Sequence, residues 1–240
     1  QNPAEMDYAV RARLTGSAQA VYIGTGVDLS DFRCRERLQA DDGKRRLVIA
    51  NVARPDPIKN HKMLLEAVDR LRSRFNRFEL WILGEGILDE ELKQWVATRG
   101  LEPWVRFWGY RDDVPRLLEQ SDIAVLTSIK EGIPRGVMEP MAMGIPVVGT
   151  RVKGTRDVIE DGKSGILVEL NDAEGLEEGL YSLLTNESLR RDLGIAGRKR
   201  IEEEFDDRNA IGKLIATYET ASAAIAAQQA RRVGLRFVPV

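Results

Sequence analysis

The chain has 240 residues, 43% hydrophobic and 31% charged, a composition typical of a globular protein with a full core. Its 36 basic and 38 acidic side chains give a net charge of −2, so no basic field would attract nucleic acid or anionic lipid. A single cysteine, Cys34, excludes an internal disulfide, and a single histidine, His61, argues against a structural zinc site. No apolar run is long enough to span a membrane, and we expect a cytoplasmic location.

The first 44 residues lack a regular hydrophobic period. A short apolar run at residues 20–23 is closed by Gly24-Thr25-Gly26, and residues 33–44 are typical of a solvated linker. The chain begins at Gln1 rather than at a methionine, so we expect a trimmed piece of a longer protein.

From Arg46 onward, buried strands alternate with amphipathic helices. Strands are predicted over residues 47–52, 78–83, 105–109, 123–128, 147–149 and 165–170. Helices are predicted to include Leu64 to Phe75, Leu88 to Val96, and Val114 to Leu118, the last with Asp113 as its N-cap. A short helix is predicted directly after the turn 130–136, and another over residues 154–159. Three more are predicted in series, over roughly 172–185, 187–204 and 207–232.

Six strands alternating with helices require right-handed crossovers. The sequence therefore predicts an α/β fold: a doubly wound, parallel, six-stranded, Rossmann-like sheet with a C-terminal helical extension. The last helix carries an apolar stripe of Ile211, Leu214, Tyr218 and Ile225. That stripe needs a partner surface, either its own sheet or something outside this chain.

The central stretch, residues 123–150, contains a charged, glycine-rich turn between a buried strand and a short helix. Open α/β sheets bind ligands at the carboxyl ends of their strands, where backbone N–H groups and the helix dipole point outward. Glu131 lies in this turn and Glu139 inside the helix that follows. A side chain of a helix leans back toward the helix N-terminus, so we expect both carboxylates to face one site.

Arg54 and Lys59 lie in the loop after the first strand, at the same edge of the sheet as Glu131. No two aspartates stand at i and i+2, so the short acidic motif that holds a metal on a diphosphate is missing. Any bound diphosphate would therefore need protein cations, which stabilise the charge that develops on a leaving group. The alternative is a solvated lysine and an arginine in a structural ion pair.

Three other patterns have ordinary explanations. Gly84-Glu85-Gly86 follows a strand as a dinucleotide motif does, but Asp89 replaces the third glycine, which favours a tight turn. Gly162-Lys163-Ser164 mimics a phosphate loop but leads into a strand, so we reject it. His61 begins a helix, and we expect it to cap or to pack.

Taken in order, these elements resemble the C-terminal, donor-binding domain of family 4 retaining glycosyltransferases, which have the two-domain GT-B fold. The resemblance covers roughly residues 21–220. It is carried by Val52-Ala53-Arg54 with Lys59, Ile82-Leu83-Gly84-Glu85-Gly86, Val105-Arg106-Phe107-Trp108-Gly109, Glu131 to Glu139, Gly144-Ile145-Pro146-Val147-Val148, and Asp161-Gly162 with Gly165.

The resemblance implies a role for each matching residue. Arg54 and Lys59 would hold the diphosphate of the donor and help it depart, and Glu131 would face the donor sugar. Glu139 would bind the ribose diol, as a carboxylate can with two hydrogen bonds. The backbone of Gly132, Ile133, Pro134, Arg135 and Gly136 would lie near sugar and phosphates, and the Tyr110-Arg111 loop would border the base. Pro140 departs from the pattern, with little cost if it lies near the first turn of its helix.

The resemblance also implies a division of the chain. Residues 1–44 would be the remnant of an N-terminal acceptor domain and its linker, and residues 45–240 the nucleotide-sugar-binding domain. We expect a metal-independent hexosyltransferase without a cofactor, using a UDP-, GDP- or ADP-linked sugar, whose isolated domain binds donor but transfers little. Two alternatives stay open: a non-catalytic nucleotide-sugar-binding module, and a sugar-nucleotide epimerase of GT-B fold.

Overall fold

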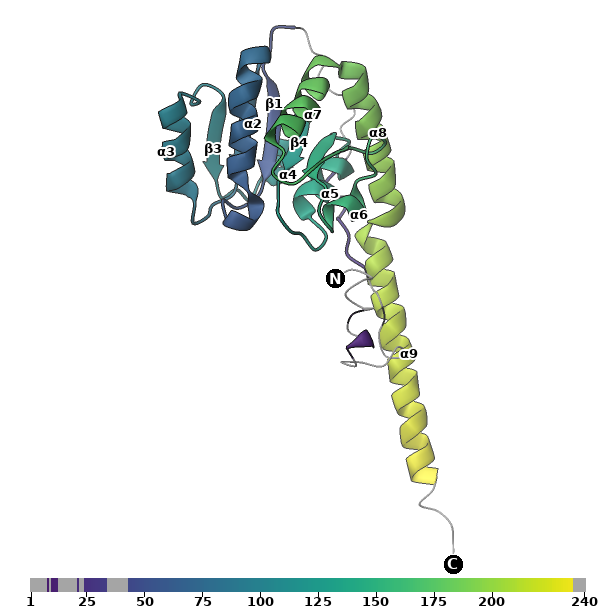
Figure 1. The fold of residues 1–240 in the computed structure, drawn as a ribbon. Coiled ribbons are helices and arrows are strands. Elements are labelled where there is room, and N and C mark those ends of the chain that lie inside the picture. The colour runs from purple at the N-terminus through teal and green to yellow at the C-terminus, as the bar shows by residue number, and fades with distance from the viewer. Residues whose placement is uncertain (1–7, 9, 13–20, 22–23, 34–42, 235–240) are drawn as a thin grey trace, which may run out of the picture.

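The structure is a computed structural model that describes residues 8, 10–12, 21, 24–33 and 43–234. Figure 1 shows a rounded α/β unit from which one long helix, α9 (Asp207–Gly234), projects. Most of the expected N-terminal remnant and linker, Cys34 included, lies outside the described residues. The predicted division between residues 1–44 and 45–240 therefore remains a prediction.

The sheet has six parallel strands in the order β3-β2-β1-β4-β5-β6. The strands are β1 (Leu47–Val52), β2 (Phe78–Leu83), β3 (Val105–Gly109), β4 (Ile123–Leu126), β5 (Val147–Thr150) and β6 (Ile166–Val168). This confirms the predicted doubly wound, Rossmann-like sheet. The strand order reverses between β1 and β4, so the loops after these two strands diverge and leave a crevice.

Helices cover both faces of the sheet and enclose two hydrophobic cores. One core packs under α2 (His61–Arg74), α3 (Asp89–Arg99) and α7 (Ala173–Thr185). The other packs under α4 (Val114–Leu118), α5 (Arg135–Ala142), α6 (Thr155–Val158) and α8 (Glu187–Glu204). Because the central strands β1, β4 and β5 are buried on both faces, their sequences are nearly continuous apolar runs rather than alternating ones, interrupted by Asn51 in β1 and Thr150 in β5.

Several element ends differ from the prediction. β4 ends at Leu126 instead of Ser128, and β6 covers only Ile166–Val168. Leu88 precedes α3 as its N-cap residue. Asp113 stands at the N-cap of α4 but makes no capping hydrogen bond, because its carboxylate pairs with the Arg111 guanidinium at 2.7 Å.

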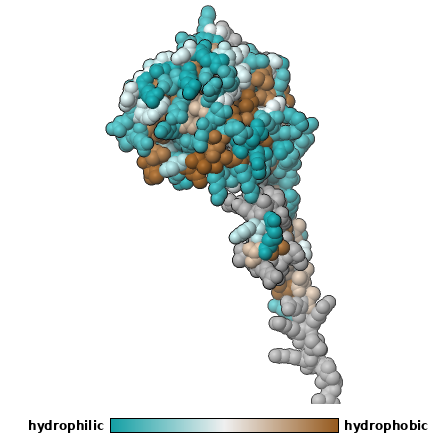
Figure 2. Space-filling model, in the orientation of Figure 1, coloured by the Kyte–Doolittle hydropathy of each residue, from teal (hydrophilic) through white to brown (hydrophobic). Residues whose placement is uncertain are grey.

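The apolar stripe of α9 does not fold back onto the sheet. Its residues Ile211, Leu214, Tyr218 and Ile225 are 50%, 37%, 70% and 57% exposed, so the structure excludes the possibility that the sheet is their partner. The beginning of the helix is anchored, since Val27 donates its N–H to the Phe205 carbonyl at 2.9 Å. Figure 2 shows a mainly hydrophilic face on the α/β unit, with hydrophobic patches between polar residues.

Candidate functional site

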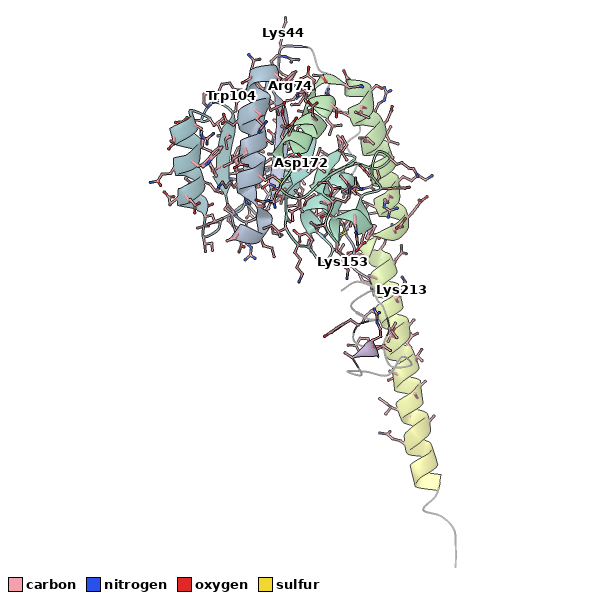
Figure 3. All side chains as sticks on the ribbon, viewed as in Figure 1. Lys44, Arg74, Trp104, Lys153, Asp172 and Lys213 are labelled. Carbon is pink, nitrogen blue, oxygen red and sulfur yellow. The ribbon has the colours of Figure 1, made fainter. Side chains whose placement is uncertain are left out.

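A cavity of about 450 Å³ opens at the carboxyl ends of the central strands, beside the point where the strand order reverses. Figure 3 places Lys44, which precedes β1, and Lys153, which follows β5, at opposite ends of the unit. The carboxyl ends of the strands therefore face the side from which α9 leaves (Figure 1). Every predicted site residue except Gly132 lines the cavity.

The loop after β1 contributes two cations. The 3-10 helix η2 (Pro57–Lys59) has Asp56 as its N-cap residue and Asn60 as its C-cap residue. The backbone of Asn60 is left-handed, with φ of 50°. Arg54 lines the cavity, and no hydrogen bond or ion pair of its guanidinium is found among the described residues. Lys59 instead binds Glu131, with Nζ and Oε1 2.6 Å apart. Of the two cations, the lysine is therefore the paired one, and the arginine is available to an anion.

Glu131 is held from two sides. Its Oε1 accepts hydrogen bonds from Lys59 Nζ and from Ser128 Oγ, and its side chain is only 11% exposed. Its backbone carbonyl and that of Gly132 face Gly154, where an added Cβ would approach them to 2.8 and 2.2 Å. Gly132 thus lies against the loop that carries Gly154, which accounts for its absence from the cavity wall.

Glu139 lies in a different environment. Its carboxylate lines the cavity from α5, is nearly buried, and accepts one hydrogen bond from Arg135 Nε at 2.8 Å. Burial raises the pKa of this carboxyl, and the Arg135 guanidinium lowers it by less. Since Arg135 is 69% exposed, it is easily displaced by a ligand that offers Glu139 hydroxyl donors.

The glycine-rich turn brings α5 into close contact with β1. A Cβ on Gly136 would lie 2.5 Å from the Val52 carbonyl oxygen, so this approach requires glycine. The helix begins at Arg135, which places Pro140 in its second turn. Pro140 therefore lies just beyond the first turn, where its missing N–H leaves one bond inside the helix unmade.

Tyr110 and Arg111 also line the cavity, from the loop after β3. Tyr110 is 76% exposed, whereas Arg111 is fixed by its ion pair with Asp113 and lies 5.5 Å from the Trp108 ring centre. An exposed ring next to a fixed guanidinium offers flat surfaces on which a base can stack.

Gly84 and Gly86 act through packing. An added Cβ would lie 2.4 Å from the Ala53 carbonyl oxygen at Gly84 and 2.2 Å from the Pro55 carbonyl oxygen at Gly86. The loop after β2 therefore supports the loop that carries Arg54, as a tight turn rather than a dinucleotide motif. Gly84 lines the cavity, and the glycine pair was the only sequence sign of this support.

His61 is buried behind the same loop. It is 1% exposed, and burial lowers its pKa to about 4. This agrees with a packing role. Within the described residues, no group of three His, Cys, Asp or Glu side chains is arranged to hold a metal ion, and no helix has the length and hydropathy to cross a membrane.

Comparison with known proteins shows to which family the chain belongs. The family model "Glycosyl transferases group 1" matches residues 34–200. The chain belongs to this family. The glycosyltransferase LpsE of Rhizobium meliloti, which acts in lipopolysaccharide core biosynthesis, is 31% identical over 77% of this chain and 52% of its own. This chain spans about half the length of the curated relatives it matches.

Two solved structures support the same assignment. The C-terminal domain of the group 1 glycosyltransferase LpcC from Francisella tularensis is 25% identical, with a TM-score of 0.68 over 75% of this chain and 99% of that one. TarM of S. aureus, crystallised with UDP, is 25% identical with a TM-score of 0.70 over 76% of this chain and 36% of its own. Both carry the Rossmann-like fold described above.

Proposed function

We propose that this chain is the donor-binding half of a retaining, family 4 glycosyltransferase with the GT-B fold. It would hold a UDP-, GDP- or ADP-linked hexose and transfer the hexosyl group to an acceptor held by an N-terminal domain. The observation that carries the proposal is one cavity whose walls combine Arg54 and Lys59 with Glu131 and Glu139. The UDP present in the TarM crystals is consistent with this choice of ligand.

Each group has a place in the proposed chemistry. The free guanidinium of Arg54 and the remaining N–H donors of Lys59 would bind the diphosphate and stabilise the charge it gains as the glycosidic bond breaks. Glu139 would exchange Arg135 for the ribose diol, and Glu131 would face the sugar. Tyr110 and Arg111 would border the base. In this proposal, protein cations replace a metal, and no cofactor takes part.

Calorimetry on the whole chain tests donor binding. We expect UDP, GDP or ADP to bind with EDTA present, and Arg54→Ala to weaken binding at least about tenfold, because a charge-assisted contact is lost. Arg70→Ala is the matched control, since Arg70 is an exposed arginine on α2 outside the cavity. Failure of all three nucleotides to bind contradicts the proposal.

Transfer requires the acceptor half. We expect the present chain to bind donor without transferring sugar, and a longer protein that includes the acceptor domain to give a product with the anomeric configuration of the donor. Proton NMR of the product reports that configuration. An inverted anomer would refute the retaining mechanism. We also propose a cytoplasmic location, which suits a chain with one cysteine.

A further inference from the structure

We propose that Ser128 is a positioning residue that orients the Glu131 carboxylate toward the sugar of the donor. This inference rests on the proposed function and extends it to a residue outside the cavity wall. Ser128 is fully buried, and its hydroxyl donates to Glu131 Oε1 at 2.5 Å. It therefore contacts the residue that faces the cavity without lining the cavity itself.

Three consecutive residues after β4 hold both sides of the ion pair. Thr127 Oγ1 donates to the carbonyl oxygens of Lys59 and Asn60, at 2.9 and 3.1 Å. The N–H of Ile129 donates to the Ile58 carbonyl at 2.8 Å. These bonds fix the turn that carries Lys59, while the Ser128 hydroxyl fixes Glu131, so residues 127–129 set the cation and the carboxylate relative to each other.

The backbone at Ser128 is itself fixed. Its carbonyl accepts a hydrogen bond from Thr150 Oγ1 at 2.6 Å, which ties the end of β4 to the end of β5. Both hydroxyl side chains, Thr150 and Thr127, are fully buried. The Ser128 hydroxyl is thus presented from a rigid support, as a group that positions a ligand-binding residue needs to be.

The two donors both bind one oxygen of the carboxylate. Lys59 Nζ and Ser128 Oγ meet at Oε1, and no described residue donates to Oε2. With Oε1 anchored at two points, the plane of the carboxylate is fixed, and Oε2 keeps its lone pairs for a sugar hydroxyl. Lys59 alone cannot fix that plane, because an ammonium is a point charge on a flexible stem.

If Ser128 acts on the sugar site, its loss should weaken binding of the sugar nucleotide more than binding of the nucleoside diphosphate. Calorimetry with UDP, GDP and ADP first identifies the base, and the matching UDP-glucose, UDP-N-acetylglucosamine, GDP-mannose or ADP-glucose then measures the contribution of the sugar. We expect Ser128→Ala to weaken binding of the best sugar nucleotide about tenfold and that of the nucleoside diphosphate less than about threefold. Ser128→Cys places a weak donor of similar size at this position, so its affinity for the sugar nucleotide should lie between those of the unaltered chain and Ser128→Ala.

Ser121→Ala is the matched control. Ser121 is equally buried at the opposite end of β4, where its hydroxyl donates to the Leu117 carbonyl at 3.0 Å. We expect this variant to leave both affinities unchanged. An equal loss in Ser121→Ala would assign the effect to general loss of packing and overturn the inference.

A double-mutant cycle tests whether Ser128 acts through Glu131. If Ser128 acts through Glu131, Ser128→Ala has no further effect on sugar-nucleotide affinity in a Glu131→Ala background. An additive effect overturns the inference, as does an unchanged sugar-nucleotide affinity in Ser128→Ala when the diphosphate binds normally. Failure of every nucleotide to bind the unaltered chain overturns the proposed function instead.

Discussion

Glu131 and Glu139 line one cavity, but their side chains have different partners. Glu131 accepts two hydrogen bonds, one from a cation, whereas Glu139 is buried with a single, exposed cationic partner. The two carboxylates therefore contribute differently to stability. Glu131 takes part in a network that holds two loops together, while ionised Glu139 is a destabilising charge in the ligand-free protein.

Glu139→Gln is expected to stabilise the ligand-free fold at neutral pH while weakening nucleotide binding. Burial raises the pKa of Glu139 above its ordinary value of 4.5 in the folded state. The protonated form is thus favoured by folding, and the stability it contributes below pH 4.5 is lost as the pH rises through the raised pKa. The gain in melting temperature of the variant should grow between pH 4 and pH 7. A gain that shrinks over this range would show that the pKa is lowered.

Lys59→Ala and Arg54→Ala should differ in stability. Loss of Lys59 leaves the Glu131 carboxylate, 11% exposed, without its cation, which we expect to cost about 1–3 kcal/mol. Loss of Arg54, which has no ion pair among the described residues, should change the free energy of unfolding by less than about 0.5 kcal/mol. Urea denaturation of both variants measures the difference, and equal losses would contradict the pairing.

At the scale of elements, close backbone contacts determine how the loops meet. Three glycines, Gly84, Gly86 and Gly136, each face a carbonyl oxygen of the segment Val52–Pro55. This segment is therefore clamped by the loop after β2 on one side and by the start of α5 on the other. The clamp positions Arg54 at the wall of the cavity.

Gly136→Ala tests this clamp. The added Cβ would lie 2.5 Å from the Val52 carbonyl oxygen, so α5 must shift, and we expect a loss of about 1–3 kcal/mol together with weaker nucleotide binding. Gly212→Ala is the control, because Gly212 lies in exposed α9 with nothing within 4 Å. That variant should be stabilised by up to about 1 kcal/mol. A stable Gly136→Ala protein would show that the contact is not tight.

At the scale of the whole molecule, α9 is an appendage of the α/β unit (Figure 1). It leaves from the same end of the unit that carries the cavity, and its apolar stripe is exposed. A chain ending after Ile211 should therefore keep its melting temperature within about 2–4 °C, since few buried side chains are lost. A chain ending after Asn186 lacks α8, with buried Leu193 and Ile201, and should not fold. Circular dichroism compares the two, and a large loss in the first would contradict an independent unit.

The strands, the helices and their order could be predicted from the sequence, because apolar runs and helical periods are local properties of the chain. The same local reading located Glu131 and Glu139 in and after a glycine-rich turn, and Arg54 and Lys59 after a buried strand. It determined the class of fold and the edge of the sheet where a ligand would bind. Which sugar and which acceptor are used does not follow from such patterns.

Only the tertiary structure decided which side chains meet. Lys59 and Glu131 are 72 residues apart, and they touch because β1 and β4 are neighbours in the sheet. The same pairing brings the residues after β4 against the turn that carries Lys59, which is why the role of Ser128 was invisible in the sequence. The exposure of the α9 stripe was equally undetermined, since a helical period shows which residues share a face but not what covers it.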